Sequence, residues 1–166
     1  MVIKIVICLI IVCVIAGVAQ IIEDIKKKER NKMSFMESYN LTELTIVTLF
    51  NGNVKLNFLL DTGSNNSFLS KSASKIKGLT YKSVRSDKCS IMCASGTSDV
   101  EQVVKMNLSY KDNVYTTELH IMESLDTSFN MLKQEYGVAV HGILGTKFMN
   151  ENNFVLDFEE LVAYKK

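Results

Sequence analysis

The chain has 166 residues, 47% of them hydrophobic and 22% charged, a composition typical of one folded domain with a short additional segment. Its formal net charge of +1 provides no broad basic surface, which argues against nucleic-acid binding. The four cysteines and two histidines stand at no spacing that fits a zinc site, so we expect neither a metal nor another cofactor.

The first feature along the chain is an apolar run over Ile5–Ile22. As a helix rising about 1.5 Å per residue, this run would extend about 27 Å, enough to cross the hydrocarbon core of a membrane. We therefore predict a transmembrane anchor over residues 1–22. A cleaved signal peptide is the alternative, because Gly17 and Ala19 are small residues of the kind found at cleavage sites.

Basic residues are distributed unevenly around this run. Lys4 alone precedes it, whereas Lys26, Lys27, Lys28, Arg30 and Lys32 follow it. The positive-inside rule then predicts a single-pass membrane protein whose C-terminal domain is cytoplasmic. Residues 23–40 are polar and charged without sustained periodicity, and they are predicted to be a juxtamembrane linker.

Residues 41–166 are predicted to form the folded domain, and their pattern is mostly that of strands. Two runs rich in apolar residues, 41–50 and 54–60, flank the pair Asn51 and Gly52, a combination typical of a tight hairpin. Further short strands are expected at 67–70, 89–94, 100–110, 114–122, 138–145, 154–158 and 161–164.

Helical segments are few in this pattern. A helical turn or loop is expected over residues 71–79, a loop with at most a helical turn over 123–136, and a short helix over 146–152. Many short strands with so little helix favour a compact all-β barrel or sandwich. A domain of about 125 residues buries one modest core.

The predicted strand over residues 54–60 leads into Asp61, Thr62, Gly63 and Ser64. An apolar strand would hold the carboxylate in a poorly solvated setting, and Gly63 would let the backbone turn tightly. The neighbouring hydroxyls can donate hydrogen bonds. An ordinary surface turn uses the same residue types, so the tetrapeptide alone does not identify a functional site.

Two separated motifs resemble those of the retropepsin-like aspartic proteases. FLLDTGSNNSFLS (residues 58–70) resembles their active-site segment, and HGILGTKFMNENNFVLDFE (141–159) is similar to their second signature. Between them lies CSIMCASGTSDVEQVV (89–104), where such proteases carry a flap. The resemblance covers residues 41–164. It implies an all-β, retropepsin-like closed β-barrel with a flap hairpin and one short helix, preceded here by the predicted N-terminal transmembrane helix.

The activity that this resemblance implies is hydrolysis of polypeptides by an aspartic endopeptidase. In that family two aspartates hold one water molecule, one carboxylate accepting its proton and the other carboxyl donating to the developing oxyanion. Here D-T-G occurs only at Asp61, since Ser128 replaces the glycine in the similar stretch at Asp126, expected to be a loop, and Asp157 has no such context. The resemblance therefore implies a homodimer in which each chain contributes one Asp61.

The resemblance also assigns roles within the active-site loop. Asp61 would be the catalytic acid and base, and Thr62 would hydrogen-bond across the dimer axis. Gly63 would allow close approach of the chains. Ser64 would donate to the Asp61 carboxylate and tune its acidity.

Two further groups of residues receive roles from the resemblance. The tip of the flap, which would pair with an extended substrate, would consist of Ser95, Gly96 and Thr97. The support beneath the active-site loop would consist of Ile143, Leu144 and Gly145.

Two questions stay open at the level of sequence. Cys89 and Cys93 lie in the expected flap, where either a disulfide or free thiols are compatible with the pattern. The alternative function is a retropepsin-like binding module that keeps the fold without cleaving peptides, and the intact D-T-G-S motif argues against it.

Overall fold

The computed structural model describes residues 2–85, 89–93, 96–100 and 102–166, and the side chains of 10–29, 31–84, 100 and 102–166. The chain divides into two compact units, Met1–Lys32 and Met33–Lys166. The first consists mainly of helix α1 (Val2–Arg30). In the described part of the chain, no helix combines the length and the apolar character needed to span a membrane. The structure therefore does not support the predicted anchor over residues 1–22, and the cytoplasmic location stays a prediction.

The second unit begins before residue 41, where the domain was expected to start. Strand β1 (Met33–Ser34) pairs antiparallel with β12 (Val162–Lys165), and helix α2 (Met36–Thr42) follows it. Met33 and Phe35 are each only 1% exposed. Residues 33–40 are thus part of the fold rather than a linker, because these two apolar side chains complete the core.

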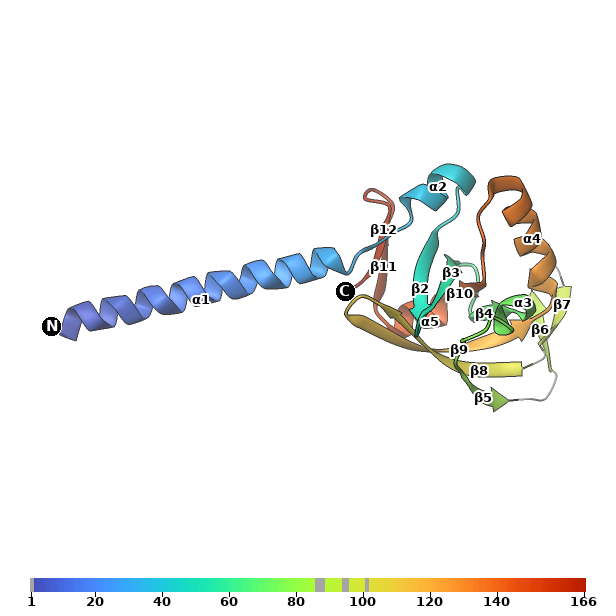
Figure 1. Cartoon of the computed structure of the whole chain (residues 1–166), viewed down its shortest axis with the longest axis horizontal. Coiled ribbons are helices and arrows are strands. Elements are labelled where there is room, and N and C mark those ends of the chain that lie inside the picture. The colour runs from blue at the N-terminus through green and yellow to red at the C-terminus, as the bar shows by residue number, and fades with distance from the viewer. Residues whose placement is uncertain (1, 86–88, 94–95, 101) are drawn as a thin grey trace. The chain divides into compact units, whose positions relative to one another are not determined.

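The main sheet of the second unit closes on itself (Figure 1). Among the described residues its strand order is β2 (Ile46–Asn51), β3 (Val54–Leu60), β10 (Gly142–Leu144), β4 (Phe68–Ser70), β9 (Asn113–Met122), β8 (Gln102–Tyr110) and β5 (Lys82–Arg85). Strand β8 also pairs with β2 through Phe50 and Ser109, which closes a six-stranded barrel and leaves β5 attached to β8. The predicted all-β closed barrel is confirmed.

Two smaller sheets accompany the barrel. Strands β11 (Phe154–Asp157) and β12 join β1 in a three-stranded sheet, as expected for the last two strands. Strands β6 (Cys89–Cys93) and β7 (Gly96–Val100) pair as a hairpin where the flap was expected. The hairpin between β2 and β3 also forms as predicted, with Gly52 in the turn at a φ of 58° that suits glycine.

The second unit contains more helices than the single short helix that was expected. The described helices after α2 are α3 (Lys71–Ser74), α4 (Ser124–Tyr136) and α5 (Thr146–Glu151). Helices α3 and α5 agree with the sequence, but the loop expected over residues 123–136 is wrong. Leu125, Phe129 and Leu132 follow the helical spacing i, i+4, i+7, and Gly137 ends α4 at a φ of 71°.

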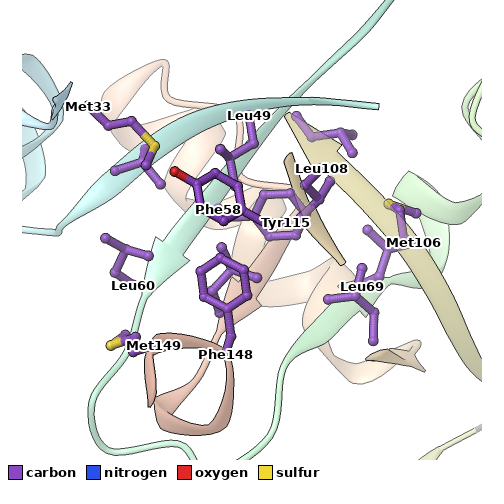
Figure 2. Packing of buried hydrophobic residues seen from close by; sticks show 14 of the residues in the cluster. Met33, Leu49, Phe58, Leu60, Leu69, Met106, Leu108, Tyr115, Phe148 and Met149 are labelled. Carbon is purple, nitrogen blue, oxygen red and sulfur yellow. The ribbon is translucent and has the colours of Figure 1, made fainter. Parts of the chain in front are cut away.

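The core fills the interior of the barrel (Figure 2). Because strand side chains alternate, Leu56, Phe58 and Leu60 of β3 point inward, while Leu59 between them stays half-buried on the other face. Each fully buried side chain of this size contributes about 1.5–3 kcal/mol to folding. Tyr115 packs its ring 5.8 Å from that of Phe148, which anchors α5 to the barrel. The core thus fixes both β3 and α5, the elements on either side of the D-T-G-S loop.

Candidate active site

Asp61 directly follows β3 and remains attached to the barrel. Strand β10 runs parallel to β3 with Leu144 opposite Leu60, and the Asp61 backbone N–H donates to the Leu144 carbonyl oxygen at 3.0 Å. The ladder between the two strands therefore continues as far as the aspartate. Asp61 is half-buried, and its backbone is tied to β10 while its carboxylate stays accessible.

The turn after Asp61 orients its carboxylate. The Gly63 N–H donates to Asp61 Oδ1 at 2.8 Å, and the Ser64 N–H donates to the Asp61 carbonyl oxygen at 3.3 Å. A Cβ on Gly63 would lie 3.2 Å from the same Oδ1, a crowded contact that favours glycine. Thr62 and Gly63 are exposed in the single chain, which leaves the outer side of the loop open to other molecules.

Ser64 makes a different contact from the predicted one. Its hydroxyl donates to the carbonyl oxygen of Asn66 at 2.9 Å and so closes the next turn of the loop. In the single chain the structure does not bring this hydroxyl to the Asp61 carboxylate. Its contribution to the site is therefore to hold the shape of the loop.

Gly145 fits tightly beneath the same loop. A Cβ at this position would lie 2.3 Å from the carbonyl oxygen of Asn66 and 2.6 Å from that of Ser64, far inside contact distance. The Thr146 N–H donates to the Ser64 carbonyl oxygen at 2.8 Å, and the Lys147 N–H donates to that of Asn65 at 3.1 Å. The start of α5 thus holds the loop by its backbone, and glycine is required for the approach.

The other two residues of the predicted support lie on opposite faces of β10. Leu144 is completely buried in the main core, whereas Ile143 is half-buried on the outer face, opposite Leu59 of β3. Strand β10 lies between β3 and β4, parallel to the first and antiparallel to the second. The strand of the second motif, β10, therefore lies between β3 and β4, the strands before and after the D-T-G-S loop. The two motifs meet at Asp61.

The predicted flap tip is only partly described. Gly96 and Thr97 belong to β7 and pair with Cys93 and Met92 of β6, respectively. Ser95 lies outside the described residues, as do the side chains of Cys89 and Cys93. The hairpin follows from the backbone pairing, while the roles of its tip residues stay predictions.

The two other aspartates considered from the sequence accept hydrogen bonds from other residues of the same chain. Asp126 lies in the first turn of α4, not in a loop, and its Oδ1 accepts from the Ser72 hydroxyl at 2.8 Å and from the Ser72 N–H at 3.1 Å. Asp157 accepts from the N–H groups of Glu159 and Glu160 in the turn after β11. Both carboxylates thus have partners that explain them structurally.

A histidine that the sequence did not single out lies just before β10. The backbone N–H of Asn57 donates to Nδ1 of His141 at 2.9 Å, and the His141 N–H donates to the Asn57 carbonyl oxygen at 2.8 Å. Burial lowers the pKa of His141, and the contact with Asn57 opposes this only in part. An unprotonated Nδ1 therefore helps to join β10 to β3 near the site.

The second histidine, His120, lies in β9, which pairs with the edge of β4 opposite to β10. The His120 N–H donates to the carbonyl oxygen of Ser67 at 2.9 Å, and its ring packs 5.7 Å from that of Phe68. Burial lowers the pKa of His120, with the carboxylate of Glu118 acting in the opposite direction. Within the described residues, no group of three or more His, Cys, Asp or Glu side chains is arranged to hold a metal ion.

Comparison with known proteins finds similarity among solved structures. No family model and no curated protein matches the sequence. EIAV protease complexed with the inhibitor HBY-793 is 20% identical, with a TM-score of 0.45 over 68% of this chain and 91% of that one. The retroviral protease-like domain of Ddi1 from Leishmania major is 13% identical, with a TM-score of 0.49 over 70% and 82%. A retropepsin-like aspartic protease from Rickettsia conorii is 18% identical, with a TM-score of 0.45 over 71% and 87%. All three are of the retropepsin type, which the two sequence motifs resemble.

Proposed function

We propose that this chain is an aspartic endopeptidase that acts as a homodimer and hydrolyses peptide bonds with water activated by two Asp61 carboxylates. One observation carries the proposal. A half-buried aspartate ends a barrel strand, one of its carboxylate oxygens accepts a backbone N–H, and the loop around it is held by the second motif across a contact that only glycine permits.

The proposed reaction needs two carboxyl groups with different protonation. Two carboxylates that share a site cannot both ionise easily, so they hold one proton and titrate as a pair. The ionised group accepts a proton from water as the water oxygen attacks the peptide carbonyl carbon. The protonated group donates to the carbonyl oxygen. Collapse of the tetrahedral species breaks the C–N bond: the carboxyl group that accepted the water proton donates it to the leaving nitrogen, and the hydroxyl formed from the carbonyl oxygen returns its proton to the other carboxylate.

A second copy of the chain supplies the second carboxylate in this proposal. D-T-G occurs once in the sequence, and the carboxylates of Asp126 and Asp157 already accept hydrogen bonds within the chain. The exposed Thr62 and Gly63 leave the loop free to meet its equivalent across a two-fold axis. These observations support a symmetric site shared by two chains.

The test is Asp61→Asn in the full chain, which removes the ionisable group while nearly preserving its shape. We expect peptide cleavage to fall by about 10³-fold or more, because neither water activation nor proton donation survives. Thermal unfolding and the dimer population, measured by analytical ultracentrifugation, are expected to stay unchanged.

Asp157→Asn is the matched control, since it removes a carboxylate from the same domain at a turn after β11. We expect this variant to keep full activity. Cleavage that persists unchanged in Asp61→Asn would exclude this aspartate as the catalyst and with it the proposed mechanism. A chain that dimerises and binds peptides but never cleaves them would instead be a binding module.

A further inference from the structure

A small cavity lies where β8, β9 and α5 meet. Because alternate residues of a strand face opposite sides, Glu118 and His120 of β9 point away from the core, as does Lys105 of β8. Together with Lys147 and Glu151 of α5, they line a space of about 240 Å³. The D-T-G residues are not among those that line it. This cavity is therefore distinct from the candidate active site.

Charges of both signs line this cavity and balance one another. The Lys147 ammonium lies 3.7 Å from Glu118 Oε2 and 4.0 Å from Glu151 Oε1. Such long, exposed ion pairs are weak, so these groups can rearrange around a ligand. Lys105 brings a second ammonium group from β8, opposite Glu118 in the ladder. The lining thus has separate positive and negative groups without an excess of either, which suits a ligand that also carries both charges.

The cavity wall also contains a polar atom that the chain itself does not satisfy. The Nδ1 atom of His120 is buried, and within the part of the chain that the structure describes no group hydrogen-bonds to it. Buried polar atoms without a partner are rare in folded proteins and call for an explanation. A polar ligand that draws the imidazole ring toward the cavity supplies one, because a neutral imidazole both donates and accepts hydrogen bonds.

The same wall supports the active-site loop from behind. Ser67 lines the cavity, its hydroxyl accepts the Gly145 N–H at 3.1 Å, and its carbonyl oxygen accepts the His120 N–H at 2.9 Å. Across the cavity, Lys147 of α5 donates its backbone N–H to the carbonyl oxygen of Asn65 at 3.1 Å. A ligand held between β8 and α5 would therefore brace the contacts that fix the loop.

We propose that this cavity binds a small zwitterion, a free amino acid or a dipeptide, and that the bound ligand steadies the active-site loop. Lys105 holds the ligand carboxylate and Glu151 holds its ammonium group, since both contacts are charge-assisted hydrogen bonds. The volume is below the range of about 300–1,000 Å³ that is usual for drug-sized ligands, so the occupant is small. Binding requires no cleavage, so this inference does not depend on the proposed protease function.

The test is isothermal titration calorimetry of the full chain with the standard free amino acids and with dialanine. We expect at least one of these zwitterions to bind with a Kd of about 1 mM or lower. The N-acetyl amide of the best ligand lacks both charges and should not bind. Whether an amino acid or dialanine binds more tightly identifies the source of the ligand. No binding by any zwitterion, or equal binding by the uncharged analogue, would overturn the inference.

Two variants at exposed positions locate the ligand. Lys105→Gln and Glu151→Gln each remove one charge from the lining, and we expect each to weaken zwitterion binding by about tenfold or more, because a charge-assisted hydrogen bond is lost. Lys55→Gln is the matched control, since Lys55 is an exposed cation of β3 that does not line this cavity. Unchanged affinity in both cavity variants would show that the ligand binds elsewhere and would overturn the inference.

Amide hydrogen exchange measures the effect on the loop without any measurement of cleavage. With ligand at about ten times its Kd, we expect exchange at Gly145 and Lys147 to slow by about tenfold, because an opening that breaks the cavity must first release the ligand. The amides of Glu159 and Glu160, in the turn after β11, serve as controls and should exchange as before. Unchanged exchange at Gly145 and Lys147 in the liganded chain would overturn the proposed effect on the loop.

Discussion

At the scale of single residues, Gly145 does more to fix the position of the active-site loop than any side chain except that of Asp61. Its Cβ position is occupied by two carbonyl oxygens of the active-site loop. Of these, the Ser64 carbonyl oxygen accepts the Thr146 N–H and the Asn66 carbonyl oxygen accepts the Ser64 hydroxyl, while the Lys147 N–H holds the carbonyl oxygen of Asn65 between them. Any side chain at position 145 would push the loop away from the start of α5 and move Asp61 with it.

We expect Gly145→Ala to lower the free energy of unfolding by about 3 kcal/mol and to abolish cleavage, because backbone atoms cannot move aside as a flexible side chain can. Urea unfolding and peptide hydrolysis measure the two effects. Gly17→Ala is the control, since a Cβ there meets nothing within 4 Å. Full activity in Gly145→Ala would show that the loop tolerates the displacement.

The protonation of a single side chain, His141, makes the stability of the fold depend on pH. Burial holds its pKa below the usual 6.5, so as the pH falls through that value the unfolded chain binds protons before the folded chain does. The contribution of His141 to stability is therefore complete above about pH 6.5 and is lost progressively at lower pH. His120 acts in the same direction.

We expect His141→Asn to reduce this pH dependence. The asparagine side-chain oxygen can accept the Asn57 N–H in place of Nδ1 but does not titrate in this range. Urea midpoints measured at pH values above and below the histidine range should fall less in the variant than in the original chain, although His120 still contributes. An identical fall in both proteins would show that His141 does not titrate differentially on unfolding.

At the scale of elements, the segment before β2 changes the boundary of the folded domain. The predicted domain started at residue 41, but Met33 of β1 and Phe35, which caps α2, are buried in the core, and the Phe35 N–H donates to the Leu161 carbonyl oxygen at 2.9 Å. These contacts are invisible locally, because the partner strand β12 lies at the other end of the sequence.

A chain beginning at Met33 should therefore fold with the full stability of the second unit. A chain beginning at Leu41 should have a much lower free energy of unfolding. Loss of two buried side chains of this size costs at least about 3 kcal/mol. We expect the shorter chain to unfold at a temperature lower by about 10 °C. Differential scanning calorimetry of the two chains makes the comparison, and equal melting temperatures would mean that β1 and α2 are dispensable.

The elements also show why sequence reasoning succeeded in some places and failed in others. The D-T-G-S loop and the glycine of the second motif are local patterns, so their positions relative to strands β3 and β10 could be predicted. Helix α4 was missed, although Leu125, Phe129 and Leu132 carry a helical spacing, because the polar residues between them suggested a loop. The hydrogen bonds between Ser72 and Asp126 had no local signal at all, since 54 positions separate the two residues.

At the scale of the whole molecule, the proposed activity belongs to a pair of chains. If both Asp61 carboxylates are needed, an equal mixture of the original chain and Asp61→Asn forms original dimers at about one quarter of the total when chains exchange freely. We expect the activity per dimer to fall to about that fraction rather than to one half. A decrease to one half, in a mixture shown to exchange, would mean that each chain works alone.

The insertion of β10 between β3 and β4 has a consequence for biosynthesis. The strand that completes the neighbourhood of Asp61 is translated long after the aspartate itself, and non-local pairing of this kind is slow to form. A nascent polypeptide still attached to the ribosome would therefore carry the reactive carboxyl group without the geometry that makes it useful. Under the proposed function, the chain could hydrolyse peptides only after its C-terminal segment has been synthesised and β10 has paired with β3 and β4.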